Sequence, residues 1–222
     1  SKAMRGEFWV VLASSYSYLS AIRLPALAEA RGIDVIWRPF LLGPVFAAQG
    51  LSDSPFNIYP VKGRYMWRDM ARRTDALGLA FAKPEPFPQN GLLAARVATA
   101  ALTDAAGIAF CQNVYDAQFA QGKNIARVDV IADCAEAAGL SRQIMEQAQS
   151  DTVKAKLRAT TETAQAKGLF GAPSFTVDEE LFWGDDRLEE ALDWAVKHGC
   201  PRASRCYGTS WSEPDWTSDF DL

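Results

Sequence analysis

The sequence has one histidine among its 222 residues, no paired-cysteine motif and no long apolar run. With His198 as the single histidine, a histidine-rich metal site is excluded, and we predict no metal. A Ser-His-Asp hydrolase would have to use His198, and no G-x-S-x-G motif accompanies it. We interpret His198 as a structural or solvent-facing residue.

The four cysteines are scattered, at Cys111, Cys134, Cys200 and Cys206. Because no two of them form a C-x-x-C pair, the signatures of a zinc ribbon and of a redox dithiol are missing. Scattered thiols in a chain of this size are typical of reduced, cytosolic cysteines. A bond between Cys200 and Cys206 across a short loop remains an open alternative.

An excess of positive charge is also lacking. The formal net charge is −4, so the chain lacks the basic surface that is typical of nucleic-acid binding. The longest apolar runs, such as Phe8 to Ala13, span about six residues, against the ~20 that cross a bilayer, and are too short for a signal peptide. We therefore expect a cytoplasmic protein that binds neither nucleic acid nor membrane.

The first part of the chain predicts a βαβ unit. The continuous apolar run Phe8 to Ala13 is typical of a buried, parallel strand. A helical pattern follows and ends at Gly32, and Ile33 to Arg38 then predicts a second strand. Strand, helix and strand within some 30 residues make up this motif.

Helices dominate the middle of the sequence, and strands return near its end. Residues 39–61 are rich in proline and glycine and predict a loop. The helical patterns cover residues 62–77, 92–106, 109–121, 128–138, 141–148 and 151–166. Residues 174–177 and 181–183 predict a β-hairpin, and residues 187–197 a last amphipathic helix.

This order predicts an α/β, thioredoxin-like fold that carries an inserted all-helical domain. Residues 6–61 and 169–199 would form the thioredoxin-like domain, and residues 62–168 the helical insertion domain. Residues 200–222 would form a polar C-terminal tail.

The junction between the first strand and the first helix is the strongest candidate site. It reads Ser14-Ser15-Tyr16-Ser17, and the positive end of a helix favours an anion such as a thiolate. Redox thioredoxin domains carry C-x-x-C here, whereas Ser14-x-x-Ser17 cannot form a disulfide. A serine hydroxyl can still donate a hydrogen bond to the thiolate of a ligand. The alternative is that Ser14 only caps the helix.

Two further segments are unusual. Pro173 enters a strand, where proline removes a ladder donor, and a cis Ala172-Pro173 bond would free the backbone before it for a peptide ligand. An ordinary trans proline is the alternative. At the start of the last helix, Asp185 or Asp186 could cap the helix or hold the ammonium group of a ligand.

Together these segments resemble the 2-hydroxychromene-2-carboxylate isomerases and kappa-class glutathione transferases of the DsbA-like branch of the thioredoxin fold. The matching segments run in the family's order across residues 8–198, at 13–19, 37–43, 62–69, 86–90, 168–175 and 182–188. Two positions depart from the family pattern: Ser15 replaces a proline, and Val11 replaces an acidic residue.

The resemblance implies glutathione as cofactor, a small aromatic carboxylate as substrate, and a homodimer. It implies that Ser14 is the catalytic serine that stabilises the glutathione thiolate. The implied glutathione-binding residues are Ser14, Ala172, Pro173, Trp183, Gly184, Asp185 and Asp186, and the implied substrate-binding residues are Asn57, Lys62 and Asn90.

The implied reaction converts 2-hydroxychromene-2-carboxylate to trans-o-hydroxybenzylidenepyruvate, a step in the degradation of aromatic hydrocarbons. One alternative is a kappa-like glutathione transferase that acts on other electrophiles. Another is a redox-inactive, DsbA-like binding or chaperone module. Thiol–disulfide exchange is disfavoured, because Ser14 and Ser17 occupy both positions of the motif.

Overall fold

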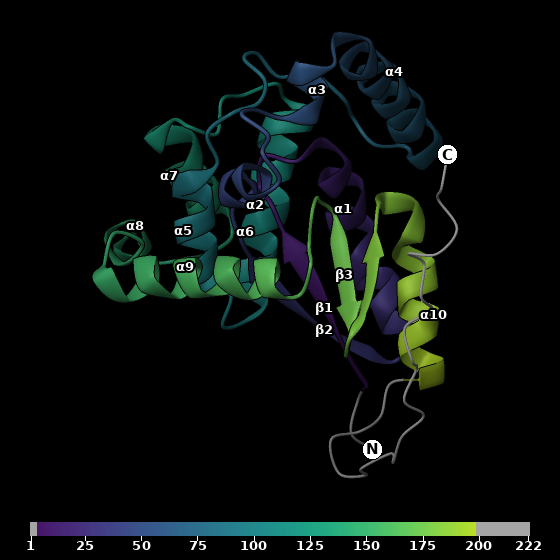
Figure 1. Cartoon of the computed structure of the whole chain (residues 1–222). Helices are drawn as coiled ribbons and strands as arrows, with labels where there is room; N and C mark the ends of the chain where they lie inside the picture. Colours follow the sequence, from purple (N-terminus) through teal and green to yellow (C-terminus); the bar gives the residue numbers. More distant parts are fainter. Residues whose placement is uncertain (1–3, 199–222) are drawn as a thin grey trace.

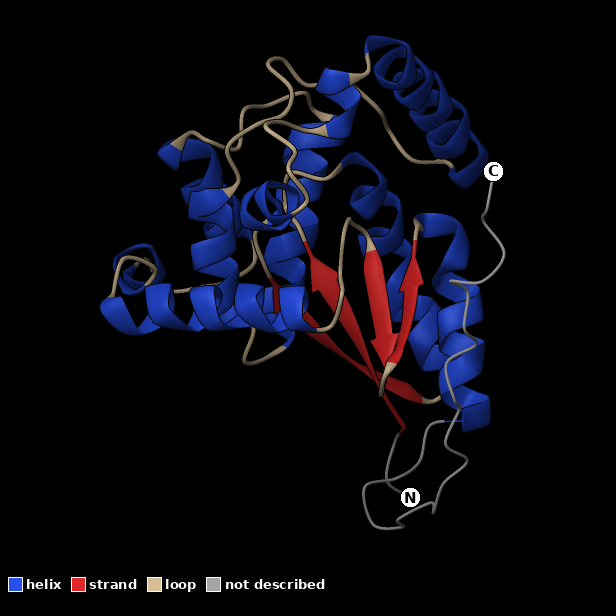
Figure 2. Cartoon of the chain, in the orientation of Figure 1, coloured by secondary structure: helices blue, strands red, loops and turns tan. Residues whose placement is uncertain are grey.

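A four-stranded mixed sheet in the order β2-β1-β3-β4 forms the centre of the structure (Figures 1 and 2). Strand β1 (Met4–Val10) pairs in parallel with β2 (Ile33–Pro39) and antiparallel with β3 (Ser174–Val177), which pairs with β4 (Glu180–Trp183). Helix α1 (Ser15–Ala30) joins the two parallel strands. The predicted βαβ unit, the hairpin and the thioredoxin-like layout are thus confirmed.

The structure is a computed structural model that describes residues 4–198. The predicted tail, with Cys200 and Cys206, lies outside the described residues. His198 is exposed and lies against Trp194, with 4.2 Å between the ring centroids, as the prediction of a structural or solvent-facing residue requires. In residues 4–198, no helix combines the length and the apolar character needed to cross a membrane.

Helices cover both faces of the sheet, which explains why β1 is apolar on both sides. Phe8 and Val10 are fully buried in the core that contains α1 and α10 (Leu188–His198). Trp9 faces the opposite way, into a second core, and its indole N–H donates to Thr176 Oγ1 at 2.8 Å. In Figure 1, the helix α9 (Asp151–Ala166) crosses one face of the sheet, and α10 packs against the other.

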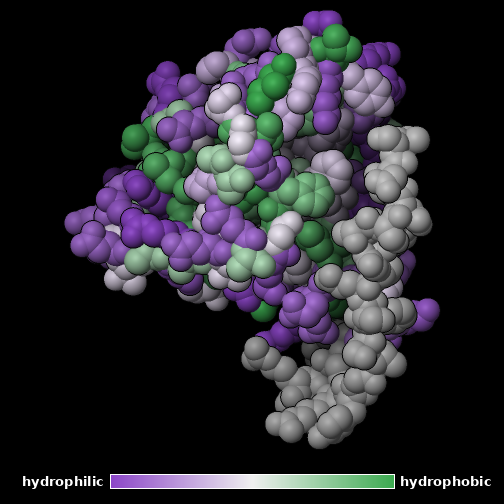
Figure 3. Space-filling model, viewed as in Figure 1, coloured by the Kyte–Doolittle hydropathy of each residue, from purple (hydrophilic) through white to green (hydrophobic). Residues whose placement is uncertain are grey.

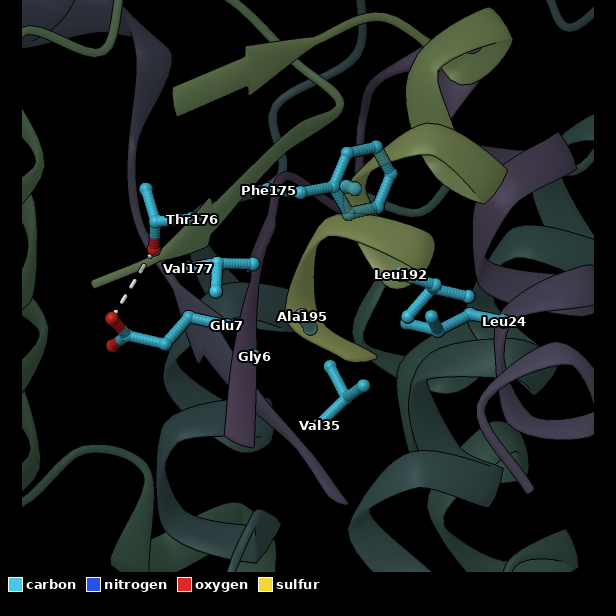
Figure 4. A pocket seen from close by; sticks show the side chains of 10 residues that line it. Gly6, Glu7, Leu24, Val35, Phe175, Thr176, Val177, Leu192 and Ala195 are labelled. Atoms are coloured by element: carbon cyan, nitrogen blue, oxygen red, sulfur yellow. Dashed lines mark hydrogen bonds between the residues drawn. The ribbon is translucent and has the colours of Figure 1, made fainter. Parts of the chain in front are cut away.

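The layer between the sheet and the helices α1 and α10 is closely packed. Figure 4 shows the cavity in this layer, whose lining includes Leu24, Phe175 and Leu192. Its volume of about 10 Å³ is close to that of one water-sized sphere. This cavity is therefore too small for an organic ligand.

The segment between β2 and β3 is helical, as predicted for its part from residue 62 onward. Its helices are α2 (Leu42–Ala48), α3 (Pro55–Ile58), α4 (Pro60–Leu77), α5 (Leu92–Ala101), α6 (Ala105–Tyr115), the π-helix η1 (Asp116–Ala120), α7 (Val128–Ala137), α8 (Gln143–Gln147) and α9. Met66, Phe110 and Val114 from this segment are fully buried in the same core as Phe8. The helical segment and the sheet thus share one apolar core.

Several predicted boundaries were wrong. The first strand ends at Val10 rather than at residue 13. Residues 39–61 contain α2 and α3, because Pro44 and Pro55 occupy first turns, where a helix needs no N–H donor.

The predicted helix over 92–106 was also wrong. It ends at Ala101, and α6 begins at Ala105, where Asp104 caps it by accepting from Ala106 N at 2.9 Å. Gly107 therefore lies inside a helix, where a Cβ would clash with the Ala101 carbonyl. The predicted helix over 109–121 comprises the rest of α6 and η1.

Candidate active site

The three candidate segments lie at the same edge of the sheet. Because Trp9 of β1 pairs antiparallel with Ser174 of β3, the end of β1 and the beginning of β3 lie together. Ser14 follows β1, and Ala172 and Pro173 precede β3. The segment that begins at Trp183 lies at the same edge, since Gly184 N donates to the Pro173 carbonyl at 2.9 Å.

Ser14 occupies the N-cap position of α1, but its hydroxyl does not cap the helix. Its backbone is extended, and α1 receives no capping hydrogen bond from its side chain. The first turn of α1 contains no acidic residue, so no carboxylate there offsets the positive end of the helix. The interpretation of Ser14 as a side-chain cap is therefore wrong, and its half-buried hydroxyl remains available to a ligand.

The other serines of the motif are turned inward. Ser17 is fully buried, and its Oγ has no hydrogen-bond partner within residues 4–198. Ser15 is 2% exposed and donates to Met66 Sδ at 2.9 Å. Among the three serines of the motif, only Ser14 is partly exposed.

Helices α3 and α4 pack beside the start of α1. Tyr16 donates its hydroxyl to Asp69 Oδ2 of α4 at 2.8 Å, and its ring lies 6.3 Å from that of Phe56 in α3. Partial burial and the bond to Asp69 raise the pKa of Tyr16 well above its usual range, so this phenol stays neutral. Tyr16 therefore anchors the helical segment to the helix that Ser14 precedes.

The three predicted substrate residues are exposed. Lys62 Nζ lies 5.8 Å from the centroid of the Phe56 ring, and Asn57 Nδ2 donates to Asp53 Oδ2 at 3.2 Å. Asn90 Oδ1 accepts from Leu92 N at 3.0 Å.

Asn90 belongs to a segment that touches the loop before Ser14. A Cβ built on the neighbouring Gly91 would lie 3.3 Å from Ala13 Cβ. The structure thus places the segment of Asn90 against the β1–α1 loop, and contact of the three predicted residues with a substrate stays a prediction.

The peptide bond between Ala172 and Pro173 is cis, as predicted. Ala172 is half-buried, and neither its N–H nor its carbonyl has a backbone partner within the described part of the chain. Both groups are therefore without a backbone partner in residues 4–198, and their pairing with an extended ligand stays a prediction. The Pro173 carbonyl, by contrast, is occupied by Gly184 N.

Trp183 forms an aromatic wall beside this loop. Its side chain is 51% exposed, and its ring lies 5.1 Å from the ring of Phe170. A Cβ on Gly171 would lie 2.7 Å from Trp183 Nε1, so glycine lets the ring lie over the loop.

Asp185 joins a buried ionic network instead of capping the last helix. Its Oδ1 accepts from Ser20 Oγ at 2.7 Å and from Arg23 Nη2 at 2.9 Å. Arg73 Nη2 of α4 lies 3.6 Å from Oδ2. The predicted helix cap at Asp185 is thus wrong, and of the two aspartates only Asp186 is exposed.

The sequence analysis missed the two arginines of this network. A signal for Arg23 was present, because it interrupts the apolar pattern of a helix, and a buried charge needs a partner. Nothing in the sequence indicated that Arg73 lies near Asp185.

The chain itself offers little reactive chemistry at this edge. Within residues 4–198, no cluster of side chains is suited to hold a metal ion. Cys111 and Cys134 are buried, and burial raises the pKa of both thiols, that of Cys134 to about 11. Within residues 4–198, neither thiol is therefore suited to react as a thiolate at neutral pH.

Comparison with known proteins identifies the family and the fold of the chain. The family model of the DSBA-like thioredoxin domain matches residues 7–193. The 2-hydroxychromene-2-carboxylate isomerase of Sphingobium xenophagum is 27% identical over 185 residues, which cover 82% of this chain and 93% of the relative. The protein of the same name from Pseudomonas putida is 25% identical over 183 residues, covering 82% and 89%.

Solved structures agree as well. A 2-hydroxychromene-2-carboxylate isomerase superposes with a TM-score of 0.79 at 24% identity, covering 87% of this chain and 95% of that one. The cytosolic disulfide reductase DsbM from Pseudomonas aeruginosa, solved with GSH, gives 0.59 at 18% identity, covering 87% and 96%. The predicted fold and the predicted resemblance to the isomerases are confirmed.

Proposed function

This chain belongs to the DSBA-like thioredoxin domain family, and we propose that it is a glutathione-dependent isomerase. Its substrate would be 2-hydroxychromene-2-carboxylate and its product trans-o-hydroxybenzylidenepyruvate. The names of the curated relatives support the reaction. One observation carries the proposal. The Ser14 hydroxyl lies at the positive end of α1 without capping it, at the same edge as the Ala172 backbone, whose N–H and carbonyl have no backbone partner in residues 4–198.

The residues at this edge fit glutathione. The N–H and carbonyl groups of Ala172 match the backbone of an extended peptide, and Ser14 with the first turn of α1 matches an anion. Trp183 offers an apolar wall, and Asp186 an exposed carboxylate for an ammonium group. When bound, glutathione would supply the thiolate that adds to the conjugated substrate and leaves again.

Ser14 would act by donating a hydrogen bond to this thiolate. A thiol with a pKa near 8.5 is only a few per cent ionised at pH 7, and lowering the pKa by two units takes about 2.7 kcal/mol. A hydrogen bond to a charged group supplies about 1.5–3 kcal/mol, and a helix terminus about 0.3–1 kcal/mol. Ser14 and the start of α1 are together sufficient for this shift.

The substrate carboxylate needs a cation or amide donors. We assign the cation to Lys62, and the amide groups to Asn57 and Asn90. Lys62 has no ion pair with a carboxylate within residues 4–198, so its charge can serve a substrate. We also propose a homodimer, which light scattering on the purified protein would test.

Calorimetry tests the proposal. Glutathione is titrated into the wild type and into Ser14→Ala between pH 6 and 9. We expect saturable binding that releases a proton near neutral pH, and we expect Ser14→Ala to lose that proton release. No binding at millimolar glutathione would overturn the proposal. Turnover of a chlorinated aromatic compound without isomerase activity would instead favour a glutathione transferase.

A further inference from the structure

A surface groove of about 350 Å³ lies between α2, α5 and α9. Its volume falls within the range of about 300–1,000 Å³ that is typical of small-molecule sites. None of the residues that line it belongs to the set that the sequence predicted as the site.

The floor of the groove is apolar. Leu157 of α9 is 2% exposed, and Leu41 and Leu92 are half-buried beside it. Leu41 N donates to Thr161 Oγ1 of α9 at 3.2 Å, and this hydroxyl donates to the Leu157 carbonyl at 2.9 Å. These bonds fix the segment before α2 against α9, so two walls of the groove are already in place without a ligand.

The rim of the groove is mostly positive. Arg96 of α5 and Lys154 and Arg158 of α9 line it, and none of the three is within 4.0 Å of a carboxylate in residues 4–198. Arg96 makes one long hydrogen bond, to Gln149 Oε1 at 3.4 Å. Glu162 is the carboxylate of the lining.

The spacing of these charges concentrates them on one face of α9. Lys154, Arg158 and Glu162 follow one another at intervals of four residues, which places them on the same side of a helix. Figure 3 shows mostly hydrophilic residues over α9 and hydrophobic residues next to it, over α5 and α7. Three cations against one anion, above an apolar floor, fit a ligand that is both apolar and negatively charged.

We propose that this groove binds a small organic anion with an aromatic body. The anionic group of the ligand pairs with Lys154 and Arg158, and the aromatic body covers Leu41, Leu92 and Leu157. A hydrogen bond between two charged groups is about twice as strong as a neutral one, so the charge on the ligand contributes much of the affinity. This site does not depend on the proposed glutathione chemistry.

The test uses 2-naphthoate as the probe, titrated by calorimetry into the full-length protein without glutathione. We expect saturable binding of one molecule per chain, and at least tenfold weaker binding of the neutral analogue 2-naphthamide. The double variant Lys154→Ala, Arg158→Ala should lose at least tenfold in affinity. Glu162→Gln should bind more tightly, because it removes the negative charge of the lining.

The matched control is Lys156→Ala, which removes one exposed cation from the same helix outside the groove. Lys156→Ala and Ser14→Ala should both bind 2-naphthoate with the affinity of the wild type. Absence of saturable binding, equal losses in Lys156→Ala and the double variant, or loss of binding in Ser14→Ala would each overturn the proposal. If the double variant does not fold, the single variants Lys154→Ala and Arg158→Ala replace it, and each should bind 2-naphthoate more weakly than Lys156→Ala does.

Discussion

Replacing Ser14 with alanine should cost the fold almost nothing, although serine at a helix N-cap is normally stabilising. Substituting an N-cap serine by alanine usually costs about 0.5–2 kcal/mol, because a backbone N–H of the first turn loses its acceptor. The Ser14 hydroxyl accepts no such bond from α1. The loss on Ser14→Ala should therefore stay within about 0.5 kcal/mol, as for an ordinary surface substitution.

Ser150 is the matched control within the same chain. It is the N-cap of α9, a helix of the same length as α1, and its Oγ accepts from Val153 N at 3.2 Å. Ser150→Ala should therefore cost about 1 kcal/mol. For a chain of this size, that corresponds to a fall of about 2–4 °C in Tm.

Urea denaturation of the wild type and both variants measures the difference. The slope of the unfolding free energy against urea should be the same in all three, so that midpoints can be compared directly. If Ser14→Ala loses as much stability as Ser150→Ala, the Ser14 hydroxyl does cap α1. The argument that this hydroxyl is available to a thiolate would then fail.

Four further predictions concern this edge and the buried cysteines. Asp185→Asn should lower the unfolding free energy by about 2 kcal/mol in urea denaturation, because it removes the buried carboxylate that pairs with Arg23 Nη2, while Glu189 still pairs with Nη1; a change below about 1 kcal/mol would contradict this. In a variant whose two tail cysteines are serine, Cys111 and Cys134 should not react with a thiol reagent at pH 8 until the protein unfolds. The same burial, which raises the pKa of Cys134 from 9.0 to about 11, should make stability fall as the pH rises between these values, because the unfolded thiol ionises first. Gly184→Ala should destabilise the fold by more than 1 kcal/mol in thermal unfolding, because its φ of 112° and the nearby Asp186 carboxylate both disfavour a Cβ; an unchanged Tm would refute the reasoning.

The sequence was sufficient to predict the elements whose signals are local. The buried run at Phe8 and the amphipathic helical patterns are local signals, and the structure has a strand or a helix at each, although the predicted helix over 92–106 is divided into α5 and α6. The short helices α2 and α3 could not be predicted, because the proline and glycine residues in this range are also typical of loops. Only the structure shows that these prolines lie in the first turns of helices. The break between α5 and α6 at Asp104 was missed for a similar reason. Gly107 was interpreted as the end of one long helix, whereas it lies in the first turn of α6.

In the candidate site, too, the features with a local sequence signal could be predicted and the others could not. Ser14 and the cis bond before Pro173 follow from a strand–helix junction and from a proline at a strand, which are local patterns. The burial of Ser17 and the partners of Asp185 depend on contacts between distant parts of the chain. Ser20 and Asp185, for example, are 165 residues apart. No pattern within one segment reports such contacts.

The apolar core that the sheet shares with the helical segment has a consequence for folding cooperativity. Leu19 and Leu24 of α1 are fully buried in the one core that also contains Phe8 of β1 and Met66 of α4, so opening either part would expose this core to water. A chain built this way should unfold in one calorimetric transition, with equal van't Hoff and calorimetric enthalpies. The helical segment is then not a detachable module, and excising it would remove the surface against which the first helix folds.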